Sequence, residues 1–186
     1  GKDETGAVVS DGAYTYTIDA VDPLTAATAT QVSGQVTIDN TKPTASINSP
    51  LANATLSGQV TIQGLANDAN WNNSCPWGWC YNSLSYGQGT SPSSWARLGN
   101  YSSPLVPDVE GNPPVIFSWD TTNLSSGDYV LRLSITDTAG NNTTADLTVN
   151  AFVSNMQAQE KETGKVEAVE VLSKPEVIIS PQSIKS

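Results

Sequence analysis

A hairpin-like segment occurs twice in the chain, and this repeat constrains the fold more than any other feature. The two copies, residues 11–22 and 126–137, lie about 115 residues apart, which is the length of one β-sandwich module. A turn and a second strand-like segment follow in both copies, over 31–39 and 143–149. The positions that align without a gap are Gly12, Tyr14 and Asp22 with Gly127, Tyr129 and Asp137. The repeat predicts similar β-sandwich modules along one chain.

Apolar and polar residues alternate within the expected strands. The clearest apolar positions are Tyr14, Tyr16 and Ile18, then Val60 and Ile62, then Leu131, Leu133 and Ile135. Alternation with period two indicates strands that bury one face and leave the other in water. Turn residues separate the strands, including Ser57-Gly58 and Ala139-Gly140-Asn141. We therefore predict an all-β protein of antiparallel sandwiches.

Composition excludes several classes of function. Charged residues make up only 14% of the chain and the net charge is −10, which argues against nucleic acid or anionic lipid as a partner. Histidine is absent, so the commonest general base and metal ligand are missing. Nothing singles out two of the eighteen acids as a catalytic pair, and there is no G-x-S-x-G motif. We expect no enzyme activity and no apolar segment that inserts into a membrane.

The chain divides at Pro43, because proline lacks the backbone N–H that would continue a strand ladder. We expect residues 1–43 to be the C-terminal part of a first module plus a linker. Residues 44–152 form a complete module, residues 153–174 a polar linker, and residues 175–186 the first strand of a further module. The chain starts at Gly1 without Met, so we expect a fragment or a processed piece.

Several stretches of the sequence resemble known protein families. The first sixteen residues, ending in Gly12-Ala-Tyr14-Thr-Tyr16, resemble the C-terminal half of the Ig-like domain of flagellar hook-capping proteins. Residues 39–50 and 58–64 resemble tandem bacterial Ig-like repeats, as do Trp119-Asp-Thr and Asp137-Thr-Ala-Gly-Asn141. The resemblance covers about 1–152, and 175–186 more weakly. It implies tandem immunoglobulin-like sandwiches that serve as spacers, stalks or adhesin modules, with no shared active site.

One segment departs from that repeat pattern. Residues 71–81 contain three of the five tryptophans and both cysteines, Cys75 and Cys80. We expect a disulfide that closes this loop, and therefore an oxidising compartment. Either the loop closes a strand crossover over the core, or its aromatic residues bind a glycan or protein. The candidate contact residues are Trp71, Trp77, Trp79 and Tyr81, whereas Trp95 and Trp119 are expected in the core.

Oxygen donors gather near the expected ends of the modules. They are Asp39, Asn40, Asp68, Asn70, Asp137 and Asn141. Calcium needs six to eight oxygen ligands, which neighbouring loops and a linker can supply together. Asp and Asn are also ordinary turn residues that hydrogen-bond their own backbone, and the spacing matches no EF-hand loop. Calcium is the only cofactor that we consider, and the turn explanation stays open beside it.

Three functions remain in competition. The first is a non-catalytic structural spacer in a secreted bacterial cell-surface or extracellular assembly. The second is an adhesin module that contacts glycan or protein through the aromatic loop. The third is a filament subunit that exchanges strands with identical chains, because half a sandwich leaves open edges and an exposed apolar face. Flanking sequence that completes each terminal module is the alternative to strand exchange.

Overall fold

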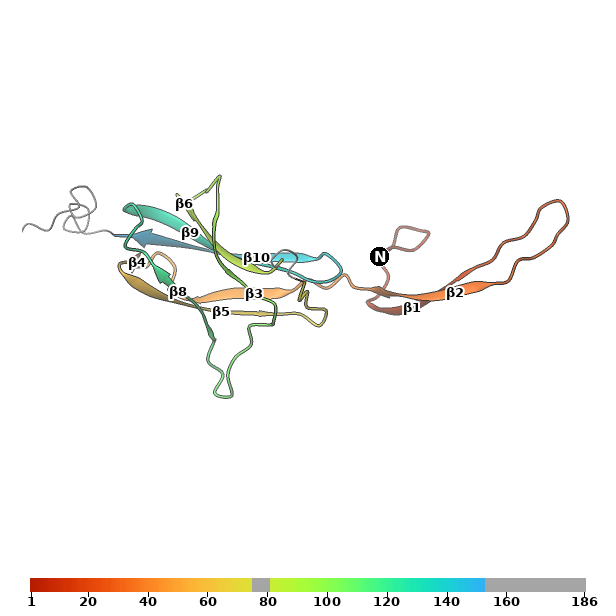
Figure 1. Cartoon of the computed structure of the whole chain (residues 1–186), viewed down its shortest axis with the longest axis horizontal. Helices are drawn as coiled ribbons and strands as arrows, with labels where there is room; N and C mark the ends of the chain where they lie inside the picture. Colours follow the sequence, from red (N-terminus) through yellow and green to blue (C-terminus); the bar gives the residue numbers. More distant parts are fainter. Residues whose placement is uncertain (75–80, 153–186) are drawn as a thin grey trace, which may run out of the picture. The chain divides into compact units, whose positions relative to one another are not determined.

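The computed structural model describes residues 1–74 and 81–152, in which every regular element is a β-strand (Figure 1). The strands form a two-stranded hairpin, a three-stranded sheet and a five-stranded sheet. All of them lie in one compact unit, Gly1–Val153. The expectation of an all-β chain with antiparallel sheets is confirmed.

The hairpin contains the first copy of the sequence repeat. It consists of β1 (Gly12–Ile18) and β2 (Val32–Ile38), which pair antiparallel from Gly12 opposite Ile38 to Ile18 opposite Val32. Every residue of β1 is exposed, so the face that alternation predicted to be buried has no cover among the described residues. The apolar pattern was identified correctly, but a two-stranded sheet has no second layer against which to bury it.

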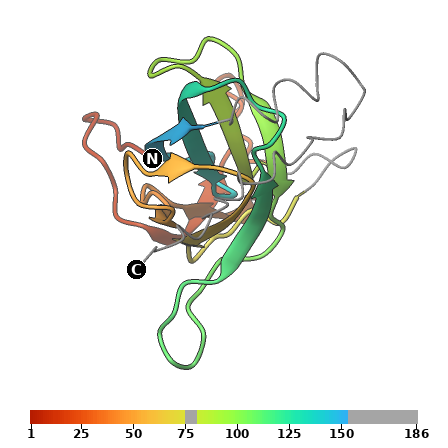
Figure 2. The same ribbon diagram turned by 90° about the vertical axis from the view of Figure 1, so that its left-hand side faces the viewer.

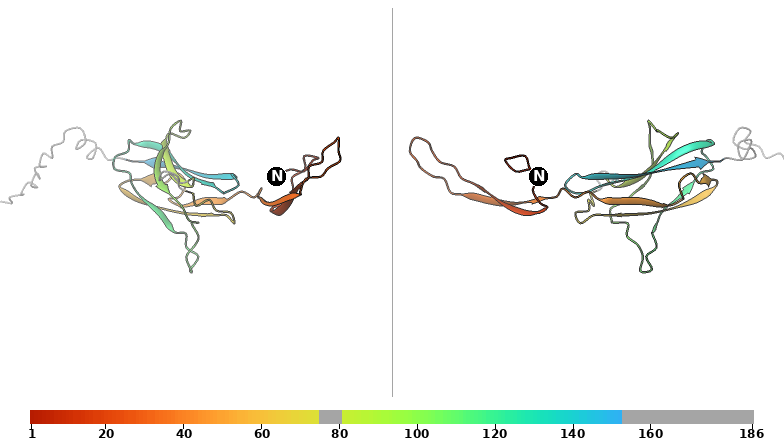
Figure 3. Two further views of the ribbon diagram at one scale, coloured as in Figure 1. Left: turned by 45° about the vertical axis from the view of Figure 1, so that its right-hand side comes forward. Right: turned by 180° about the vertical axis from the view of Figure 1, so that it is seen from behind.

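The other two sheets pack face to face as a sandwich (Figure 2). The three-stranded sheet has the order β3-β5-β8, with β3 (Thr44–Ser49), β5 (Gln59–Asn67) and β8 (Val115–Asp120). The five-stranded sheet has the order β4-β10-β9-β6-β7. Its strands are β4 (Thr55–Leu56), β6 (Ser83–Gln88), β7 (Ala96–Asn100), β9 (Gly127–Thr136) and β10 (Asn142–Ala151). A long loop joins β7 to β8 (Figure 3).

The core lies between these sheets and uses the alternating residues of the expected strands. Leu131, Leu133 and Ile135 of β9 are fully buried, as is Ile62 of β5. Trp119 is 3% exposed and stacks near Tyr86, with 4.9 Å between their ring centroids. The prediction that Trp119 lies in the core is confirmed. Aromatic pairs of this kind add to the stabilisation from burial.

Tyr129 begins the buried part of β9 with a tyrosine corner. Its hydroxyl donates a hydrogen bond to the carbonyl of Ser125, four residues earlier, at 3.1 Å. The same bond occurs in the hairpin, where Tyr14 donates to the carbonyl of Ser10 at 2.8 Å. Tyrosine corners mark the equivalent strand in immunoglobulin-type sandwiches. The hairpin β1–β2 is therefore the structural counterpart of β9–β10.

The second and last strands of the sandwich, β4 and β10, pair with each other. Residues of β4 run parallel to the end of β10, with Thr55 opposite Asn150 and Leu56 opposite Ala151. Three backbone hydrogen bonds join them: Asn53 N–H to Thr148, Asn150 N–H to Ala54 and Phe152 N–H to Leu56, at 2.8, 2.9 and 2.8 Å. This pairing closes the sandwich beside the point where the described chain leaves it.

Candidate functional site

Three carboxylates from distant parts of the sequence meet at the end of the sandwich where β3 begins. Asp39 lies in the segment after β2, Asp68 follows β5, and Asp137 follows β9. Their side-chain oxygens lie within 4.8 Å of one another. Asp137 is buried, at 1% exposed, whereas Asp39 and Asp68 are half-buried. We call these three residues the carboxylate cluster.

Two asparagine side chains hold the carboxylate cluster together. Asn70 donates from Nδ2 to Asp39 at 2.7 Å, and Asn141 donates from Nδ2 to Asp137 at 2.7 Å. Asn141 also donates from Nδ2 to the backbone carbonyl of Asp39 at 3.1 Å. Amide N–H groups moderate the repulsion between carboxylates, because each one places partial positive charge on a charged oxygen. These bonds attach the linker before β3 to the loops of the sandwich.

Five of the six residues expected near calcium are thus brought together by the fold. Their oxygen atoms are hard donors of the kind that calcium prefers. No lysine or arginine among residues 1–74 and 81–152 forms an ion pair with the cluster. For Asn70 or Asn141 to coordinate a cation through its amide oxygen, its side chain would have to turn, since the amide nitrogen now faces a carboxylate. Calcium binding stays a prediction.

Asn40, the sixth of these residues, is not part of the cluster. Its backbone N–H and its Nδ2 donate to Oδ1 of Asp11, at 2.7 and 2.8 Å, and Nδ2 also donates to the carbonyl of Val9. The Thr41 hydroxyl donates to the other oxygen of Asp11. Hydrogen bonds from Thr41 and Asn40 hold the pKa of the Asp11 carboxyl below its usual value. Asp11 therefore ties the linker to the hairpin, a role that the sequence did not suggest.

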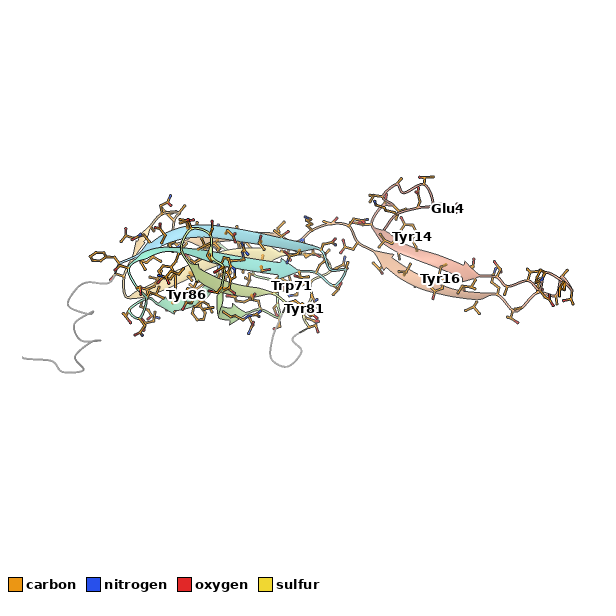
Figure 4. All side chains as sticks on the ribbon, turned by 90° about the horizontal axis from the view of Figure 1, so that it is seen from above. Glu4, Tyr14, Tyr16, Trp71, Tyr81 and Tyr86 are labelled. Atoms are coloured by element: carbon orange, nitrogen blue, oxygen red, sulfur yellow. The ribbon has the colours of Figure 1, made fainter. Side chains whose placement is uncertain are left out.

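The aromatic loop begins and ends beside the carboxylate cluster. Cys75, Cys80, Trp77 and Trp79 lie outside the described residues, so the expected disulfide and contact surface stay predictions. Trp71 is half-buried, packs against the core and bridges to Asp137. Its indole nitrogen is buried without a partner among the described residues. Tyr81 is 55% exposed, so of the two flanking aromatics it is the one open to a partner (Figure 4).

Asn82 anchors the end of the aromatic loop, and sequence reasoning missed it. The residue is fully buried. Its Nδ2 donates to the carbonyl of Asn72 at 2.9 Å, and its Oδ1 accepts from the backbone N–H of Thr136 at 2.8 Å. Buried amides of this kind are costly unless they are paired. Asparagine is so common in turns of this chain that its sequence gives no separate indication of the role.

Trp95 is not in the core, contrary to expectation. It is half-exposed on the outer face of the five-stranded sheet, where the Arg132 guanidinium lies 4.2 Å from the centroid of its ring. Arg132 also forms a bidentate ion pair with Asp146, at 2.7 and 2.6 Å. The loop before β7 folds back over this face, and a shallow pocket of about 390 Å³ opens there. The cation–π contact with Arg132 stabilises this position of Trp95 although the ring is not buried in the core.

The sandwich and its tyrosine corner are those of an immunoglobulin-like fold. The family model of the bacterial Ig-like domain (group 3) matches residues 6–70, which include β1 to β5 and two members of the carboxylate cluster. No curated protein sequence matches the chain significantly. Bacterial Ig-like domains are typical of surface or extracellular proteins. Among the described residues, no helix is long and apolar enough to span a membrane.

Among the solved structures that are similar over part of the chain is one enzyme. It is the endo-β-1,4-mannanase from Thermotoga petrophila, at 14% identity and a TM-score of 0.38. The similarity covers 62% of this chain and 21% of that chain. The chain therefore spans about a fifth of the enzyme. The TM-score is too low for this similarity to carry an argument about fold or activity.

Proposed function

We propose that the chain is a non-catalytic structural spacer of a secreted bacterial assembly, and that its sandwich carries tension between its two ends. One observation carries this proposal: β4, near the start of the sandwich, pairs parallel with the end of β10, its last strand. The similarity of residues 6–70 to a bacterial Ig-like domain supports the secreted setting. A domain that bears load must resist unfolding when its termini are pulled apart.

Parallel pairing of β4, the second strand of the sandwich, with β10, its last, meets that requirement. When the chain is pulled before β3 and after β10, the force first acts on the pairing of β3 with β5. Once β3 is released, β4 and β10 slide past each other along their length. The three backbone hydrogen bonds between them must then break together. In an antiparallel hairpin that is pulled from its open end, the bonds break one at a time. Loading several bonds at once raises the force at which the sandwich opens, although each contributes only about 1 kcal/mol.

The linker supports the same role at the other end. It is bonded to Asp11 of the hairpin through Asn40, and to Asn70 and Asn141 of the sandwich through Asp39. Pro43, at its end, is buried. A segment with these contacts and a fixed proline φ has little freedom to bend. Such a junction suits a spacer, because a stiff junction keeps successive domains at a set distance.

Single-molecule pulling on the full chain tests the proposal. Phe152→Pro removes the N–H that donates to Leu56, whereas Phe152→Ala keeps that N–H and removes the exposed ring. We expect Phe152→Pro to lower the force at which the sandwich opens and Phe152→Ala to leave it unchanged. Equal forces for both variants and the wild type would contradict the proposal.

Glycan or protein binding by the aromatic loop is the second candidate. It is favoured by the exposure of Tyr81 beside the expected tryptophans. A titration with soluble polysaccharides, followed by tryptophan fluorescence, tests it against the Trp77→Ala, Trp79→Ala double variant. Quenching that the double variant abolishes would support an adhesin role. No quenching, or quenching that the double variant retains, would count against it.

A further inference from the structure

The hairpin has an apolar face that corresponds to a buried face in the sandwich. Tyr14, Tyr16 and Ile18 of β1 occupy the positions that Tyr129, Leu131 and Leu133 occupy in β9. The glycine before each tyrosine has a positive φ, 153° at Gly12 and 139° at Gly127. Both tyrosines form the same corner bond. The local structure of the two hairpins is therefore alike.

Their surroundings differ. The three β9 residues are at most 3% exposed, whereas Tyr14, Tyr16 and Ile18 are 37%, 48% and 58% exposed. On β2, Val36 lies opposite Tyr14 and Val32 lies opposite Ile18, at 48% and 60% exposed. Figure 4 shows Tyr14 and Tyr16 on β1. We call these five residues the hairpin face. An exposed apolar surface of this kind on a sheet is a candidate docking site.

The sandwich shows which element covers such a face. Of the three strands in the opposing sheet, β3 is the one that lies against both β9 and β10. The sequence of β3 and its flanks, Lys42-Pro-Thr-Ala-Ser-Ile-Asn-Ser-Pro50, has a counterpart in Lys174-Pro-Glu-Val-Ile-Ile-Ser-Pro181, outside the described residues. The counterpart is one residue shorter. The missing residue corresponds to Asn48, where the pairing of β3 with β5 shifts register.

Charge also favours this pairing. The hairpin and its loops carry many more acids than bases, with Asp3, Glu4, Asp11, Asp19, Asp22 and Asp39 against Lys2. The segment after residue 173 carries Lys174 and Lys185 against Glu176. Opposite net charges raise the rate at which two surfaces meet. They also disfavour the pairing of two hairpins or of two C-terminal segments, because these carry charge of the same sign. The apolar residues Val177, Ile178 and Ile179 supply the side chains that a strand over the hairpin face needs.

We propose that residues 174–181 of a second copy of this chain dock across the hairpin face, in the place that β3 takes on β9–β10. Because donor and acceptor surfaces differ, each copy could accept one neighbour and supply another, which gives an open, head-to-tail assembly. This inference extends the proposed structural role but stands apart from it. A failure to assemble would leave the pulling experiment on the sandwich unaffected.

Sedimentation equilibrium of the full chain over a wide concentration range tests the proposal. We expect wild-type chains to form dimers and longer species as concentration rises. Ile179→Ser should weaken association at least about tenfold, because it places a hydroxyl where an apolar side chain is buried. Val171→Ser, the same kind of change outside the β3-like segment, should have no effect. A monomer at every concentration, including one whose own segment folds back, would overturn the proposal, as would association that survives Ile179→Ser.

A synthetic peptide of residues 172–186 gives a second test that does not depend on folding of a variant. The peptide should compete with the donor segment and return wild-type assemblies to monomers. The same peptide with the Ile179→Ser change should not. Assemblies that the wild-type peptide leaves intact would show that the interface lies elsewhere and would overturn the proposal.

Discussion

Tyr14 and Tyr129 form the same local hydrogen bond, but Tyr14 is exposed and Tyr129 is buried. A comparison of the two residues therefore separates the effect of the local bond on stability from the effect of packing. Tyr129→Phe removes the hydrogen bond to Ser125 from a residue that is 3% exposed. We expect it to lower the free energy of unfolding of the sandwich by about 1 kcal/mol, measured by urea denaturation. Tyr14→Phe removes the matching bond from the exposed hairpin and should leave the sandwich transition unchanged. An equal loss in both variants would contradict this assignment.

Asp11 gives a prediction for pH. Hydrogen bonds from Thr41 and Asn40 lower its pKa in the folded chain. The ionised Asp11 carboxylate therefore stabilises the folded chain above the ordinary aspartate pKa of about 3.9. This stabilisation is lost as the pH falls through the lower pKa that Asp11 has in the folded chain. The NMR shift of the Asn40 amide, which bonds Asp11, should titrate with a midpoint below about 3.9. A midpoint at or above that value would contradict the bond.

The carboxylate cluster leads to a prediction about how calcium changes the stability of the chain. If calcium binds there, ten times its dissociation constant should stabilise the chain by about 1.4 kcal/mol. Thermal unfolding with calcium and with EDTA measures the difference. Asp68→Asn should abolish it, whereas Asp128→Asn, which changes a carboxylate away from the cluster, should retain it. An unchanged unfolding temperature in wild-type protein would show that turn chemistry alone explains these residues.

At the scale of the elements, alternation located the strands that have a clear pattern but not their ends. The strands β1, β2, β5, β9 and β10 appear where the sequence predicted strands. β4, with two residues, and β6 and β7 were not predicted, because they are short and flanked by irregular loops. The three carboxylates of the cluster, and Asn70 and Asn141 that bond to them, were named from the sequence as oxygen donors at the expected module ends. Asn82 was not named, because its hydrogen bond with Thr136 depends on a contact between distant segments of the chain.

The buried face of β9 should dominate the stability of the sandwich. Leu133 is fully buried between the sheets, so Leu133→Ala leaves a cavity and should cost about 2–5 kcal/mol. Thr144→Ala, on the exposed face of the neighbouring β10, should cost well under about 1 kcal/mol. Chemical denaturation of both variants checks the contrast. A similar small cost for both would mean that the core does not lie where these strands place it.

For the whole molecule, the described chain combines an uncovered hairpin, a linker that is hydrogen-bonded on both sides, and a sandwich whose second and last strands pair in parallel. The division at Pro43 into partial and complete modules stays a prediction, as does the parent assembly. The parallel pairing of β4 with β10 was not visible in the sequence, since β4 is too short to leave a pattern.

The direction of pulling tests the central claim most directly. In the full chain, force applied at the two termini unzips β1–β2, then acts on the pairing of β3 with β5, and then loads β4 and β10 along their length. Force applied instead between the loop before β9 and the end of β10 opens that pair from one end. The account predicts that the sandwich yields at a clearly higher force in the first geometry than in the second. Equal forces, or a lower force along the termini, would contradict a load-bearing spacer.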